Sequence, residues 1–207
     1  MTFAGGLLAL TGGAVAGPLD DAEAWFRMGA AYDTGQGTEQ NHAQALQWYL
    51  RAAEQGHVLA QYTAGEFYTL GTGSEVDYQE AAAWTLRAAE QGHAGAQQNL
   101  AAMYFAGRGV AQDYPQAASW YRAAAAQGTA DAQFRLGQMY ANGRGVPQDH
   151  VRAHLWFSLA AASATGEEAK AATVHRDLAA QQMTPAQIAQ AQEMARTCRQ
   201  SAFKQCD

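Results

Sequence analysis

Residues 96–131 read AQQNLAAMYFAGRGVAQDYPQAASWYRAAAAQGTAD, and the same 36-residue pattern begins again at Ala24, Ala60 and Ala132 without a gap. The four copies share eight identical columns, which include one tyrosine, one tryptophan and two glycine columns. These four columns are Tyr32, Tyr68, Tyr104 and Tyr140; Trp48, Trp84, Trp120 and Trp156; Gly35, Gly71, Gly107 and Gly143; and Gly37, Gly73, Gly109 and Gly145. Self-similarity at a fixed period is typical of a repeat protein.

Each copy predicts two helices separated by a glycine break. In the fourth copy, Ala132, Leu136, Met139 and Tyr140 recur at the spacing of one helix face. The glycine pair that follows can adopt the left-handed conformation that ends a helix. The predicted N-caps of the second helices are Asn41, Asp77, Asp113 and Asp149, and the predicted capping-box partners are Gln44, Glu80 and Gln116.

The residue types within one copy, and the spacing between them, resemble those of a known family. The third copy contains Leu100, Tyr104, Gly107-Arg108-Gly109-Val110, Asp113, Ala117, Trp120-Tyr121, Ala124-Ala125 and Gly128. This series resembles the Sel-one-like repeat family, which is related to the tetratricopeptide repeats. The resemblance implies an all-α fold, a right-handed α/α solenoid of four helix–turn–helix repeats at 24–59, 60–95, 96–131 and 132–166. It also implies a non-catalytic scaffold or adaptor that binds a protein or peptide on the surface lined by the first helices.

Residues 167–207 follow the repeats and predict a pair of capping helices with a tail. The first helix is expected over 167–182. The run Thr184-Pro185-Ala186-Gln187 predicts the start of the second, with threonine as N-cap, proline at the first helical position and glutamine as its box partner. A terminal repeat needs such a cover because its outer apolar face would otherwise meet water.

Two cysteines, Cys198 and Cys206, lie near the end of this cap. Eight residues of continuous helix would place them ~12 Å apart, which is too far for a disulfide. A disulfide therefore requires the helix to end near Gln200 and the tail to fold back. The alternative is two free thiols, with Cys198 packed in a helix interface.

The first sixteen residues differ from the rest of the chain. Residues 3–15 are apolar and uncharged, and Ala14-Val15-Ala16 has the A-x-A form of a signal-peptide cleavage site, although no Lys or Arg precedes it. The run is shorter than the ~20 apolar residues of a membrane-spanning helix. We therefore expect a signal peptide over 1–16, a linker over 17–23 and a periplasmic or secreted bacterial protein. The alternative is a disordered, glycine-rich leader.

A variable strip on the first helices is the candidate partner-binding surface. Each copy begins with an alanine, and the third, sixth and tenth positions after it vary between copies. These positions fall on one helix face. They are Arg27, Ala30 and Thr34; Thr63, Glu66 and Leu70; Asn99, Ala102 and Ala106; and Arg135, Gln138 and Asn142. We interpret this strip as a surface that recognises a protein or peptide; the alternative is a merely solvated face. The net charge of −6 argues against nucleic acid as the partner.

Other patterns in the sequence suggest chemistry but are incomplete. The Gly-x-Gly pairs follow a helix, whereas a dinucleotide-binding loop follows a strand. His150 and His154 could face one metal, but no third ligand is evident. Ser201 and Lys204 have the S-x-x-K spacing of serine β-lactamases, and one branch of the resembling family carries that label, but the partner motifs S-D-N and K-T-G are missing. We expect no enzyme, cofactor or metal, and keep an envelope hydrolase and a metal- or redox-linked protein as alternatives.

Overall fold

The computed structural model describes residues 18–204 and Cys206, and the fold is given for these residues. The predicted leader, residues 1–16, lies outside them. The expected linker over 17–23 is wrong from Pro18 onward, where the first helix begins. A proline is well accommodated in the first turn because its missing N–H would have no intrahelical partner there. Asp21, close to the helix start, also interacts favourably with the helix dipole.

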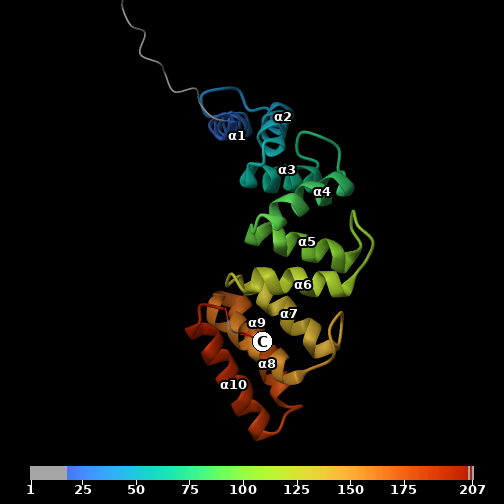
Figure 1. Ribbon diagram of the computed structural model, residues 1–207, viewed down its shortest axis with the longest axis vertical. Coiled ribbons are helices and arrows are strands. Elements are labelled where there is room, and N and C mark those ends of the chain that lie inside the picture. The colour runs from blue at the N-terminus through green and yellow to red at the C-terminus, as the bar shows by residue number, and fades with distance from the viewer. Residues whose placement is uncertain (1–17, 205, 207) are drawn as a thin grey trace, which may run out of the picture.

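The described part of the chain forms ten α-helices that stack along one axis (Figure 1). They are α1 (Pro18–Thr34), α2 (His42–Glu54), α3 (Val58–Leu70), α4 (Tyr78–Glu90), α5 (Ala94–Ala106), α6 (Tyr114–Ala125), α7 (Ala130–Asn142), α8 (His150–Ser163), α9 (Gly166–Ala180) and α10 (Pro185–Gln200). The first eight pair as α1–α2, α3–α4, α5–α6 and α7–α8, and each pair packs on the next through α2–α3, α4–α5 and α6–α7. The predicted all-α solenoid of four helix pairs is confirmed.

The second helix of each pair begins at the predicted cap. The side chains of Asn41, Asp77, Asp113 and Asp149 each accept a hydrogen bond from a backbone N–H of the following helix. The backbone N–H groups of the same four residues donate to the carbonyls of the tyrosine column at 2.8–3.0 Å, which closes each loop. The capping boxes predicted at Gln44, Glu80 and Gln116 are only half formed. The backbone N–H of each of these residues donates to the cap side chain, but their own side chains accept no hydrogen bond from the backbone N–H of the cap residue. The reciprocal pair is complete at Thr184 and Gln187.

Two of the first helices begin at a histidine. His57 and His93 are the N-caps of α3 and α5, and the Nδ1 atom of each accepts a hydrogen bond from a backbone N–H at 3.1 Å. The third equivalent residue, Thr129, makes no side-chain cap bond. A ring nitrogen that accepts a hydrogen bond carries no proton, so each cap uses the unprotonated Nδ1.

The second glycine column sets the distance between neighbouring repeats. These glycines have φ near +73°, and a Cβ at any of three of them would overlap the backbone of the preceding repeat. The colliding pairs are Gly73 with His42, Gly109 with Tyr78, and Gly145 with Tyr114. Gly37, in the first repeat, has no heavy atom within 4 Å of such a Cβ. The repeats therefore meet backbone to backbone at this point.

A row of buried glutamines joins successive repeats. Gln61, Gln97 and Gln133 donate through Nε2 to the carbonyls of Ala53, Ala89 and Ala125, each on the second helix of the preceding repeat, at 3.0–3.3 Å. The Oε1 atoms of the first two accept from Gln91 and Gln127 at 2.7 and 2.8 Å. The next residue in that column is Ser163, and the Oε1 atom of Gln133 has no hydrogen-bond partner in the described part of the chain.

The core consists of the alanine columns and large side chains between the helix layers. Alanines such as Ala45, Ala81, Ala117 and Ala153 are fully buried, so neighbouring helices can approach closely. The tryptophan column is less uniform, because Trp156 is 1% exposed whereas Trp48 and Trp120 are only half-buried.

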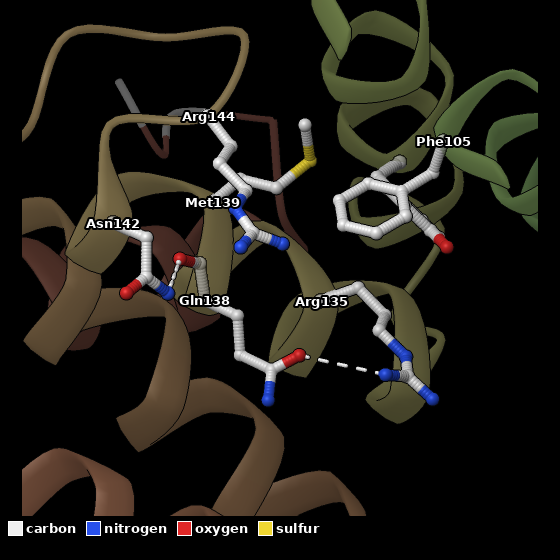
Figure 2. Close-up of a pocket in the computed structure, with 7 residues that line it drawn as sticks. Phe105, Arg135, Gln138, Met139, Asn142 and Arg144 are labelled. Carbon is white, nitrogen blue, oxygen red and sulfur yellow. Dashed lines mark hydrogen bonds between the residues drawn. The ribbon is translucent and has the colours of Figure 1, made fainter. Parts of the chain in front are cut away.

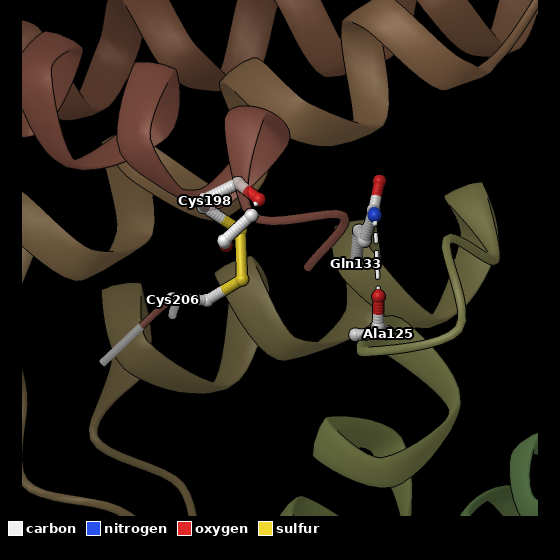
Figure 3. Close-up of a disulfide and its surroundings, with 5 residues drawn as sticks. Ala125, Gln133, Cys198 and Cys206 are labelled. Atoms are coloured by element: carbon white, nitrogen blue, oxygen red, sulfur yellow. Dashed lines mark hydrogen bonds between the residues drawn. A yellow bond between two sulfur atoms is a disulfide. The ribbon is translucent and has the colours of Figure 1, made fainter. Parts of the chain in front are cut away.

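The helices α9 and α10 both pack against α8 and cover the end of the array (Figure 1). The helix α10 ends at Gln200, and Ala202 and Phe203 have left-handed φ angles of 50° and 64° that turn the tail back. Cys198 and Cys206 are joined by a disulfide with their Cα atoms 4.5 Å apart, near Gln133 of α7 (Figure 3). The geometric requirement for this bond, a helix that ends near Gln200, is met.

Candidate functional site

Two adjoining cavities form a groove along α5 and α7. One has a volume of about 190 Å³ and is lined by Phe105, Tyr121, Arg135, Gln138, Asn142 and Arg144, among others. The other, of about 420 Å³, is lined by Asn99, Ala102, Ala106 and Arg108 and shares Phe105, Tyr121 and Arg135 with the first. We call this pair of cavities the inner groove. Because the third and fourth repeats both contribute to it, the groove depends on how these repeats are stacked.

The side chains of the inner groove come from helices and from the glycine loop that follows α7 (Figure 2). Arg135, Gln138 and Asn142 lie on α7 at the helical spacing predicted for the strip, and the side-chain amide of Asn142 donates to the carbonyl of Gln138 at 2.7 Å. Arg144 lies in the glycine loop that follows α7. Phe105 lies near the end of α5 and packs edge-on against Tyr114, with ring centroids 5.1 Å apart.

The groove is positively charged, with three arginines and one aspartate on its walls. Arg135 forms a 3.5 Å ion pair with Asp131, and both side chains are about half exposed. Arg108 and Arg144 lie over the rings of Tyr78 and Phe105, 5.1 and 5.9 Å from the ring centroids. Among the described residues, no carboxylate lies within 4.0 Å of either of these two guanidinium groups.

Tyr121 on α6 lines both cavities of the groove. Burial raises the pKa of its hydroxyl to about 12, so the group stays protonated at neutral pH. Within the described part of the chain this hydroxyl makes no hydrogen bond, so it remains able to donate one to a ligand.

The structure brings half of the predicted strip together at the inner groove. Asn99, Ala102, Ala106, Arg135, Gln138 and Asn142 line it. These residues share one hollow surface, but no observation here tests their role in binding, which stays a prediction.

The strip residues of the first two repeats lie outside the inner groove. Arg27 is engaged in a 2.8 Å ion pair with Glu23, and it lines a shallow surface with Ala24, Met28 and Ala31 at the start of the array. The remaining members have local roles: Thr34 donates to the carbonyl of Ala30, Glu66 accepts from the Tyr62 hydroxyl, Thr63 is half-buried, and Leu70 is 73% exposed.

Several groove residues were missed in the sequence. Arg108 and Arg144 occupy the variable position of the Gly-x-Gly pairs, which the sequence pattern marks only as helix breaks. The signal was present, since the same position holds Gln36 and Thr72 in the first two repeats and changes to arginine in the last two. Phe105 was missed because the strip was limited to the third, sixth and tenth positions after the first alanine of each copy, and Phe105 is at the ninth.

The residues behind the alternative chemistries are placed differently. His154 is 4% exposed and faces Arg176 and Asp177; burial and then the Arg176 charge lower its pKa. The described residues include no group of three His, Cys, Asp or Glu side chains that could hold a metal ion. Ser201 donates through its hydroxyl to the Cys198 carbonyl at 2.9 Å, and Lys204 is exposed in the turn that follows. Neither lines the inner groove.

Comparison with known proteins gives a consistent picture. The family model described as Sel1 repeat matches residues 22–57, 58–93, 94–129 and 130–164, each beginning two residues before our rows. Comparison with curated proteins gave no match. Across the described residues, none of the helices combines the length and apolar character that crossing a membrane requires.

Solved structures share this architecture. A Sel1 repeat protein from Oxalobacter formigenes is 33% identical with a TM-score of 0.69, and the match covers 79% of this chain and 74% of that one. The protective antigen c5321 of uropathogenic Escherichia coli, which displays an SLR fold, is 29% identical with a TM-score of 0.51; the match covers 88% of this chain but only 47% of that one. Cysteine-rich protein B of Helicobacter pylori, at 21% identity and a TM-score of 0.50, shares the fold over 63% of this chain and 94% of its own.

Proposed function

Because the chain belongs to the Sel1 repeat family, we propose that it is an exported, non-catalytic scaffold that holds a segment of a partner protein in the inner groove. Sel1 repeat proteins are generally protein-interaction scaffolds. The observation that supports this use of the groove is its construction from two neighbouring repeats, with polar side chains of α7 along one wall and Phe105 of α5 on the other. Solenoid proteins use such extended hollow surfaces to bind partners.

Export rests on the leader and on the cysteines. The apolar segment and A-x-A pattern over residues 1–16 favour secretion. The Cys198–Cys206 disulfide favours an oxidising compartment, because disulfides are rare in the reducing cytosol. Expression of the full chain in a bacterial host, followed by mass spectrometry of the periplasmic fraction, should find a mature N-terminus at Gly17. An uncleaved chain confined to the cytosol would overturn export.

The binding surface can be tested by photo-crosslinking from two positions in the same repeat. Ala102 is exposed on α5 in the inner groove, and Ser119 is exposed on α6. A photoreactive residue at 102 should give a discrete partner adduct in envelope extract, and one at 119 should not. Equal adducts from both positions, or none from 102, would overturn the assignment of the surface. No observation favours the hydrolase alternative.

A further inference from the structure

The inner groove is basic in a protein that is acidic overall. The chain carries a formal net charge of −6, yet three arginines and a single aspartate line the groove. The arginine at the Gly-x-Gly position occurs only in the last two repeats, as Arg108 and Arg144. The positive charge is therefore localised at one stretch of the array.

Two of the three groove arginines have no carboxylate partner among the described residues. Arg135 has Asp131 at 3.5 Å, but no described carboxylate lies within 4.0 Å of Arg108 or Arg144. The ring of Phe105 beneath Arg144 favours one position of the guanidinium by a cation–π interaction. A guanidinium that is already positioned can form two parallel hydrogen bonds to a carboxylate with little further loss of conformational entropy.

We propose that the inner groove binds an acidic peptide segment, with carboxylates held by Arg135 and Arg144 and a neighbouring apolar side chain against Phe105. This rests on the proposed scaffold function and specifies the chemistry of its partner. Gln138, which accepts from Arg135 at 3.5 Å, provides a further polar contact within the same cavity. The hydroxyl of Tyr121, which has no hydrogen-bond partner among the described residues, provides another.

The wider surface distinguishes a short acidic segment from a long polyanion. The strip of the second repeat carries Glu66, and that of the first pairs Arg27 with Glu23, so positive charge does not continue along the array. At physiological salt, charges interact over about 8 Å. A short peptide in the groove therefore experiences the local arginines, whereas a nucleic acid extending beyond it meets an acidic protein.

The test uses the full chain and two labelled peptides in fluorescence anisotropy. One peptide alternates glutamate with leucine, and the other replaces every glutamate by glutamine. We expect the glutamate peptide to bind at least about tenfold more tightly at low salt, and this preference to shrink as salt is added. Equal binding of the two peptides, or a single-stranded oligonucleotide that displaces the glutamate peptide at equal or lower concentration, would overturn the proposal.

Two variants separate the groove from general charge. Arg144→Gln should weaken the glutamate peptide about tenfold. Arg87→Gln removes the same charge from an arginine that also lies over an aromatic ring, that of Trp84 on α4, and should leave affinity unchanged. Equal losses in both variants, with thermal melts showing both folded, would overturn the proposal.

The outcome can also be told apart from failure of the scaffold function. If a partner crosslinks from position 102 equally well in wild type and Arg144→Gln, the scaffold stands and its acidic specificity falls. If no partner crosslinks from 102, the scaffold assignment itself falls, whatever the peptide binding shows.

Discussion

The four tryptophans of the repeat occupy one column, but their surroundings differ. The sequence pattern places all four between repeats, whereas only Trp84 and Trp156 are buried in the structure. Trp156 lies on α8, against which both cap helices pack, while Trp48 and Trp120 keep part of their rings in solvent. Burial at a repeated position therefore depends on what each repeat has on its outer side.

Trp156→Ala should lower the free energy of unfolding by about 3–5 kcal/mol, because it removes a fully buried aromatic ring and leaves a cavity. Trp48→Ala should cost clearly less, since that ring is only half-buried. Urea unfolding followed by circular dichroism measures both. Equal losses would mean that exposure in the structure does not describe the contribution of this column.

Gly37 and Gly109 belong to the same glycine column, have similar positive φ angles and form a matched pair for comparison. Gly37→Ala should cost about 1 kcal/mol, the backbone penalty of a left-handed conformation for a residue with a Cβ. Gly109→Ala should cost about 1–3 kcal/mol more, because its Cβ also overlaps the carbonyl of Tyr78. The difference in urea unfolding isolates the contact between repeats. If the two variants lose the same stability, that contact is not a constraint.

At the scale of the helix, the histidine cap of α5 links stability to pH. Burial lowers the pKa of His93 below its usual 6.5, and the neutral ring accepts a hydrogen bond from the Ala96 N–H. The unfolded chain therefore binds a proton at a higher pH than the folded chain does. The stabilisation is present above pH 6.5 and is lost as the pH falls through the folded pKa.

The corresponding measurement is urea unfolding at pH 7.5 and 5.5. The wild type should be less stable at the lower pH, and His93→Asn should reduce this difference because asparagine caps without titrating. Burial also lowers the pKa of His154, so part of the loss of stability at low pH should remain in the variant. A wild type that is equally stable at both pH values would contradict the prediction.

The α10 tail provides a second prediction for an element. Cys206→Ser should lower the free energy of unfolding by about 2–3 kcal/mol, because the disulfide restricts the unfolded chain. Adding reductant to the wild type should reproduce the loss, and adding it to the variant should change nothing further. A wild type that is unaffected by reductant would show that the disulfide does not contribute to stability.

At the scale of the whole molecule, we expect the glutamine row to couple the unfolding of successive repeats. Gln97 is hydrogen-bonded to Ala89 of the preceding repeat and to Gln127 at the end of its own. Gln97→Leu should cost about 1–3 kcal/mol, since it leaves buried polar groups without partners. The slope of the unfolding free energy against urea concentration should also be smaller in the variant, because the two halves of the array become less tightly coupled. An unchanged slope would show that the glutamine row is not needed for coupling.

The sequence predicted the helices well because their signals are local. The apolar spacing, the left-handed glycines and the caps at Asn41 and Asp149 all act within a few residues of one another. The glutamine row was not foreseen, because Gln97 finds its partners only when neighbouring repeats are stacked. The prediction of a linker over residues 17–23 was wrong from Pro18 onward. It did not take into account that a proline is compatible with the first turn of a helix.

The strip was predicted on the first helices of all four repeats, and only its members on α5 and α7 line the inner groove. Helical spacing alone aligns residues such as Gln138 and Asn142, and the role of the strip in binding stays a prediction. The arginines of the glycine loops, Arg108 and Arg144, were missed, because a loop side chain can be directed into the groove only by the fold of its loop. The charge of the groove, and with it the chemistry of the proposed partner, follows from these two residues.

The backbone contact at Gly73, Gly109 and Gly145 has an evolutionary consequence. Main-chain atoms of the preceding repeat lie against these glycines, so this contact does not involve the side chains that line the inner groove. Point substitutions in the groove, including one at the residue between the two glycines, can then alter ligand preference while the architecture persists. Such a scaffold can diversify its specificity one position at a time, without a compensating change elsewhere.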